Sequence, residues 1–156
     1  MYKRILVPVD GSDTSNKALV AALQMARDSG GRVRLLQVFD ELAYLSGFEM
    51  TPEVLQSARD YAQKVLDDTL AMANSAGVPA DTRLVETVGL RLGELVADEA
   101  RAWEADLVVV GTHGRRGVGR VLLGSGAEQV IRLAPVPVLA VRDADLRADP
   151  RDTGTR

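Results

Sequence analysis

The chain has 156 residues, of which 46% are hydrophobic and 26% are charged, and its formal net charge is −3. This balance is typical of an ordinary globular domain, and it excludes a collagen-like chain, a coiled coil and a long disordered protein. The absence of Cys excludes disulfides and thiolate metal sites, and the single His excludes a multi-histidine metal site within one chain.

The charge and hydropathy pattern also indicates where the protein acts. With 19 basic against 22 acidic side chains, the chain lacks the positive excess of a general nucleic-acid binder. The N-terminal apolar run is too short for a signal peptide, and no stretch reaches the ~18 apolar residues of a membrane span. We therefore expect a cytoplasmic protein with no nucleic-acid and no membrane partner.

The first predicted unit is a strand, a tight turn and a helix. Residues 5–9 form a continuous apolar run, which is typical of a strand buried on both faces. The run ends at Asp10-Gly11-Ser12, and residues 12–15 offer side-chain oxygens that cap helix N-termini. Apolar residues then recur at helical spacing, and Gly30-Gly31 ends the helix because glycine adopts the left-handed cap conformation.

The alternation of strand and helix continues along the rest of the chain. We predict further strands at 33–39, 83–85, 107–110 and 137–141, and further helices at 54–76, 92–103 and 125–133. From residue 143 the composition is polar and charged, so we expect one domain at 1–142 and a flexible tail at 143–156. Five strands that alternate with four helices predict an α/β fold, with a parallel sheet covered on both faces.

In open parallel sheets, ligands bind beyond the carboxyl ends of the strands, which draws attention to the turn at 10–12 and the loop at 111–124. Glycines at 111 and 114 allow a ligand to approach the backbone closely. Gly124-Ser125 begins a helix, whose free amides and dipole favour an anion. Three basic side chains raise the local positive potential: Arg115, Arg116 and Arg120.

Known phosphate-binding motifs do not match this loop. The Gly119-x4-Gly124-Ser125 segment lacks the lysine of a P-loop, and a dinucleotide fingerprint would need glycine where Leu122 stands. The loop also contains no Gly-x-Ser-x-Gly nucleophile elbow. From these features alone, a phosphate site and a glycine-rich connection to a capped helix are equal alternatives.

Three segments together resemble the nucleotide-binding subgroup of the universal stress protein family. The opening segment 5–12 resembles the first strand and turn of that family, and the closing segment 134–141 resembles its last strand. The loop matches the family pattern Gly-x2-Gly-x9-Gly-Ser/Thr. The resemblance extends over about residues 2–142.

The resemblance implies a Rossmann-like fold of the adenine nucleotide alpha-hydrolase type, with a five-stranded parallel sheet of order 3-2-1-4-5 and helices on both faces. It implies that an adenosine nucleotide, ATP with Mg²⁺, binds between the first and fourth strands. The expected function is that of a nucleotide-dependent regulatory module in the stress response, acting through a downstream protein partner. A homodimer formed through the final strand at 136–142 is also implied.

The resemblance further assigns the base and ribose contacts. Pro8 and Val9 would line the base pocket, and Val38 would contact the adenine through its backbone. Asp10 would accept a hydrogen bond from a ribose hydroxyl, and Gly111 would lie against the ribose. From the residues alone Asp10 has a second interpretation, because Asp after a strand commonly closes a turn.

The phosphates would be held by Gly114, Gly124 and Ser125. His113 would line the site, since no carboxylate near it in the sequence supports a role as a base. Gly126 departs from the larger residue usual in the family, and it loosens the helix start by up to ~1 kcal/mol. Direct phosphate contacts by the three loop arginines are left open.

Two alternative functions share these residues. A slow ATPase or a phosphotransferase would use the same site, but the loop supplies neither an evident general base nor a P-loop lysine. A dimeric scaffold that binds no nucleotide is the second alternative, and the family members of that kind lose the glycine pattern that this chain retains.

Overall fold

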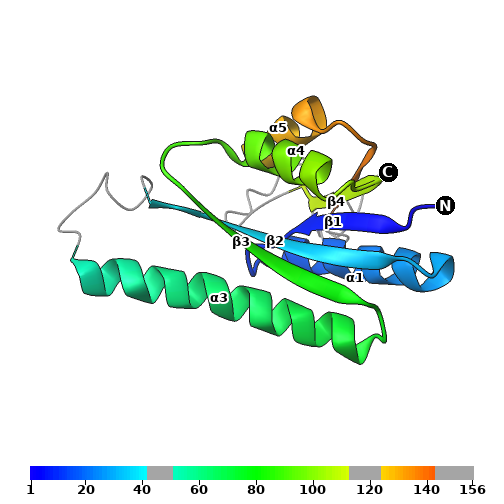
Figure 1. The fold of residues 1–156 in the computed structure, drawn as a ribbon, viewed down its shortest axis with the longest axis horizontal. Coiled ribbons are helices and arrows are strands. Elements are labelled where there is room, and N and C mark those ends of the chain that lie inside the picture. Colours follow the sequence, from blue (N-terminus) through cyan, green and yellow to red (C-terminus); the bar gives the residue numbers. More distant parts are fainter. Residues whose placement is uncertain (42–50, 113–123, 143–156) are drawn as a thin grey trace, which may run out of the picture.

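The alternation predicted from the sequence is present in the computed structural model, which describes residues 1–41, 51–112 and 124–142 (Figure 1). The elements, in chain order, are β1 (Arg4–Pro8), α1 (Asp13–Ser29), β2 (Arg32–Asp40), α3 (Pro52–Ser75), β3 (Ala80–Thr87), α4 (Leu92–Ala102), β4 (Leu107–Gly111), α5 (Ser125–Leu133) and β5 (Val138–Val141). The tail at 143–156 lies outside the described residues. No helix in the described ranges is long and apolar enough to cross a membrane.

The five strands form one parallel sheet in the order β3-β2-β1-β4-β5, which confirms the expected topology. The strand predicted at 83–85 is longer than expected, because β3 pairs with β2 from Val33↔Ala80 to Asp40↔Thr87. As an edge strand β3 is only partly buried, and its polar positions interrupt the apolar run by which buried strands are found.

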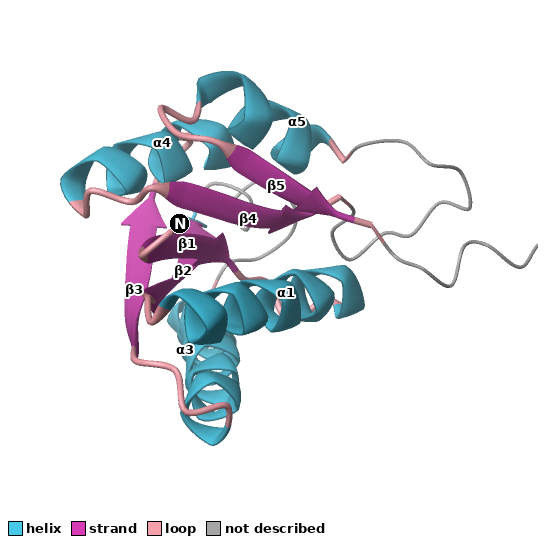
Figure 2. Ribbon diagram, turned by 90° about the vertical axis from the view of Figure 1, so that its right-hand side faces the viewer, coloured by secondary structure: helices cyan, strands magenta, loops and turns pink. Residues whose placement is uncertain are grey.

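Helices cover both faces of the sheet (Figure 2). One core lies beneath α1 and α3 and includes Ile5 and Val7 of β1, whereas Leu6 belongs to the core beneath α4 and α5. Successive side chains of a strand point to opposite faces, so a continuous apolar run supplies both cores.

The ends of α1 follow the sequence prediction. The Ser12 side chain accepts a hydrogen bond from the Ser15 amide at 3.2 Å, which caps the helix at its N-terminus. Gly30 ends the helix with φ 66°, in the left-handed conformation that glycine adopts without a steric penalty. Because Ser12 is the N-cap, the helix starts immediately after the turn that follows β1.

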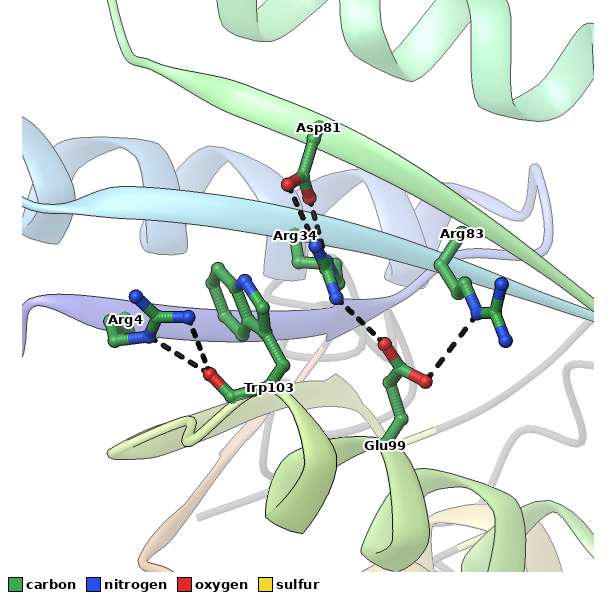
Figure 3. A network of polar contacts seen from close by, with 6 residues as sticks. All are labelled: Arg4, Arg34, Asp81, Arg83, Glu99 and Trp103. Atoms are coloured by element: carbon green, nitrogen blue, oxygen red, sulfur yellow. Dashed lines mark hydrogen bonds and ion pairs between the residues drawn. The ribbon is translucent and has the colours of Figure 1, made fainter.

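Trp103, at the C-terminal end of α4, is 6% exposed and lies between two arginines (Figure 3). The Arg4 and Arg34 guanidinium carbons lie 4.7 and 4.8 Å from the Trp103 ring centroid. Arg4 also donates to the Trp103 carbonyl oxygen from Nε at 2.9 Å and from Nη2 at 2.6 Å. These contacts attach the C-terminal end of α4 to β1 and β2.

Carboxylates complete this network. Arg34 donates to both carboxylate oxygens of Asp81, at 2.7 and 2.8 Å, and to Glu99 at 2.9 Å. Glu99 is buried and also pairs with Arg83 at 3.6 Å (Figure 3). Because the Glu99 carboxylate pairs with two arginines, it can be buried next to an apolar core.

The hydrogen bond from Arg34 lowers the pKa of the Asp81 carboxyl below its usual value. The ionised form is therefore favoured by folding, and its contribution is complete above about pH 4, the pKa of an unfolded Asp. We expect the difference in free energy of unfolding between the wild type and Asp81→Asn to shrink as the pH falls below about 4. Urea unfolding between pH 3 and 7 measures this difference, and a constant difference would contradict the pairing.

Candidate functional site

A cavity of about 730 Å³ lies at the carboxyl ends of β1, β2 and β4. It includes the crevice between β1 and β4, where the strand order reverses, which is the usual ligand position in open α/β sheets. Eight of the ten residues expected from the sequence line the cavity: Pro8, Val9, Asp10, Val38, Gly111, Gly124, Ser125 and Gly126. The other two, His113 and Gly114, lie outside the described residues, as do the three loop arginines.

Asp10 closes the turn between β1 and α1. Its Oδ1 accepts a hydrogen bond from the Ser12 amide at 2.8 Å, and its own amide donates to the Ser15 hydroxyl at 3.2 Å. In the described part of the chain, no hydrogen bond reaches its second carboxylate oxygen, Oδ2. The turn function is therefore present, and it leaves one charged acceptor at the cavity.

Backbone groups of β2 become available where β1 ends. The pairing of β1 with β2 stops at Pro8↔Leu36, followed by one hydrogen bond from the Val9 amide to the Leu36 carbonyl at 2.9 Å. Alternate residues of a strand bond to opposite neighbours, so Val38 directs its backbone groups to the side on which β1 has ended. This edge faces the cavity and offers a donor and an acceptor to a flat ligand.

The N-terminus of α5 forms another wall of the cavity. Its N-cap residue is Gly124, which has no side chain to cap the helix, and the Gly124 amide donates to the Thr112 carbonyl at 2.6 Å. Within the described ranges, the amides of residues 125–127 make no hydrogen bond. Three free amides at the positive end of a helix dipole form a site suited to an anion.

One wall of the cavity, the connection from β3 to α4, was not predicted from the sequence. Residues 89–92 line the cavity, and the Gly89 amide donates to Asp40 Oδ1 at 3.2 Å. The carboxyl ends of parallel strands meet at one edge of the sheet. A sequence prediction that ended β3 at Thr87 would therefore have placed this connection at the site. Further lining residues were also missed: Ser15, Leu36, Gln37, Val110, Thr112, Ala127 and Gln129.

Gly111 and Gly126 differ in the space around them. A Cβ atom on Gly111 would lie 2.8 Å from the Thr14 carbonyl oxygen and 2.9 Å from its carbon. On Gly126 the contact would be 3.0 Å to the end of the Leu92 side chain. The absence of a side chain at 111 thus allows β4 to pack directly against the first turn of α1.

The model of the universal stress protein family matches residues 1–142. The chain belongs to the universal stress protein family. A universal stress protein of Methanocaldococcus jannaschii is 35% identical over 147 residues, which cover 91% of this chain and 83% of that protein.

Solved structures of universal stress proteins have the same fold. A family member from Burkholderia pseudomallei is 35% identical with a TM-score of 0.72, covering 90% of this chain and 96% of its own. A universal stress protein in complex with cAMP is 27% identical with a TM-score of 0.67, covering 90% of this chain and 97% of its own.

Alanine at Gly111 and alanine at Gly126 should have different effects on the stability of this universal stress protein. We expect Gly111→Ala to lower the free energy of unfolding by about 1–3 kcal/mol, because the methyl group meets the backbone of α1. Gly126→Ala is the matched control. It should be neutral or raise stability by up to about 1 kcal/mol, since alanine favours the helix and the Leu92 side chain can turn away. Urea denaturation tests both, and equal effects would contradict this interpretation.

Proposed function

We propose that this universal stress protein binds an adenosine nucleotide, ATP with Mg²⁺, in the cavity between β1 and β4, and that occupancy regulates a downstream protein partner. The observation that carries the proposal is that three different groups line one cavity. These are the backbone edge at Val38, the carboxylate of Asp10 and the free amides at the start of α5.

Each group suits one part of a nucleotide. The strand edge at Val38 offers a donor and an acceptor to adenine, between apolar walls that include Val9 and Leu92. Asp10 Oδ2 would accept from a ribose hydroxyl, and the α5 amides would hold phosphate oxygens. A cavity of about 730 Å³ is within the range of small-molecule sites, and a relative solved with cAMP supports this class of ligand.

Mg²⁺ would enter with the phosphates. No group of three His, Cys, Asp or Glu side chains in the described residues could hold a metal ion. Mg²⁺ in nucleotide sites is usually bound by substrate phosphates, water and one or two carboxylates, so such a cluster is not needed. Among the described residues, Asp10 and Asp40 are the carboxylates that line the cavity.

The decisive test separates the two functions of Asp10. Asn also closes this type of turn, because its Oδ1 can accept from the Ser12 amide, but its Nδ2 cannot accept from ribose. We expect Asp10→Asn to weaken ATP binding at least about tenfold, which is typical for loss of a hydrogen bond to a charged group. Its free energy of unfolding should change by less than about 0.5 kcal/mol.

Isothermal titration of nucleotide-free protein with ATP and Mg²⁺ measures this effect. No saturable binding by the wild type would refute the proposed function. Binding by the wild type and an unchanged dissociation constant for Asp10→Asn would refute only the ribose contact. Formation of ADP in the same samples, at a rate well above that of spontaneous ATP hydrolysis without protein, would favour the ATPase alternative.

We further propose a homodimer through β5. This strand is at the edge of the sheet and pairs only with β4 among the described strands, so no described strand covers its outer edge. Leu139 of this strand is exposed, and so are Ile131 and Leu133 of α5, a helix that contacts β5. An apolar edge strand of this kind requires a cover, and a second copy of the same strand across a two-fold axis provides one.

A charge on the edge strand tests this arrangement. Leu139 is 39% exposed, so a lysine at this position can reach solvent in the monomer but would be placed inside a β5 interface. We expect the wild type to sediment as a dimer and Leu139→Lys as a folded monomer. Val20→Lys, on α1, is the control, because Val20 is also exposed and lines a groove with Asp68 and Ala71 of α3. A monomeric wild type, or a dimeric Leu139→Lys, would overturn the interface.

A further inference from the structure

Thr112 follows β4 directly, and both of its backbone groups are bound. Its amide donates to the Val141 carbonyl at 3.0 Å, and its carbonyl accepts from the Gly124 amide at 2.6 Å. The residue is therefore fixed between the end of β5 and the start of α5. Its side chain is almost completely buried, with 4% of the residue exposed.

The hydroxyl of Thr112 is buried and has no hydrogen-bond partner in the described part of the chain. A buried hydroxyl without a partner is destabilising, and such groups are rare in folded proteins. Valine has the same shape and would fill this position without that cost. The partner of this hydroxyl therefore lies outside the described residues, and a bound ligand can supply it.

The alternation of side chains along β4 places the hydroxyl on the side of α5. Val108 and Val110 belong to the core beneath α4 and α5, whereas Leu107 and Val109 belong to the opposite core. Thr112 is two residues beyond Val110, so its side chain continues on the α5 side and lines the cavity there. The free amides of residues 125–127 begin the helix on the same side.

We propose that the Thr112 hydroxyl donates a hydrogen bond to a phosphate oxygen of the bound nucleotide, the group that the α5 amides also hold. All these groups are donors without an acceptor among the described residues, and a phosphate offers several acceptor oxygens at once. The inference rests on the proposed function. It makes Thr112 a binding residue for the phosphate end only, without a contact to the base or the ribose.

Thr112→Val and Thr112→Ser form a matched pair, because the first retains the shape and the second retains the hydroxyl. Adenosine and ADP, titrated calorimetrically, differ in the phosphates that the hydroxyl would contact. We expect Thr112→Val to bind ADP about tenfold more weakly and to bind adenosine as the wild type does. Thr112→Ser should bind ADP within about twofold of the wild type. The melting temperature of nucleotide-free Thr112→Val should equal or exceed that of the wild type.

The other outcomes overturn the inference in different ways. Unchanged ADP binding by Thr112→Val, with a wild type that binds ADP, would show that another group or a buried water satisfies the hydroxyl. Equal losses for adenosine and ADP, or a lower melting temperature, would assign Thr112 a structural role. A wild type that binds neither ligand would refute the proposed function, and this inference with it.

Discussion

The short length of β1 is the constraint on which the rest of the structure depends. β1 has five residues and ends at Pro8, whereas β2 has nine and continues to Asp40 alongside β3. The sheet therefore has a notch at its centre, where β2 continues beyond the end of β1 and lies opposite β4 across the gap. The edge of β2, the turn at Asp10 and the start of α5 all reach this notch, so one early strand end brings together groups that are distant in the sequence.

The glycine pattern of the loop cannot be assigned to ligand binding alone. Gly111 lines the cavity, but its missing side chain is also what allows β4 to approach the first turn of α1. Gly124 lines the cavity as well, and it begins α5 without a side-chain cap. The packing of the fold and the chemistry of the site thus depend on the same small residues.

The sequence predicts the fold almost completely, because buried parallel strands are visible as apolar runs and the helix ends have capping residues. It predicts β3 too short, because polar residues of this partly buried edge strand interrupt the apolar run. The site was predicted from the turns after β1 and β4, together with the family resemblance. The wall at 89–92 was missed because these residues carry no motif and enter the site only through the true end of β3. The unpaired state of Thr112 could not be predicted, since it depends on contacts with β5 and α5 that only the folded chain creates.

The path from α5 to β5 has a mechanical consequence. α5 has nine residues and is therefore about 13 Å long, with its first turn at the cavity and its last turn close to the sheet edge. The link between them, Ala134-Pro135-Val136-Pro137, contains two prolines, whose rings fix φ and make the segment stiff. Helix and link together are a short connection with restricted backbone freedom. The first turn of α5 at the cavity is therefore joined to the edge strand β5 through very few freely rotating backbone bonds.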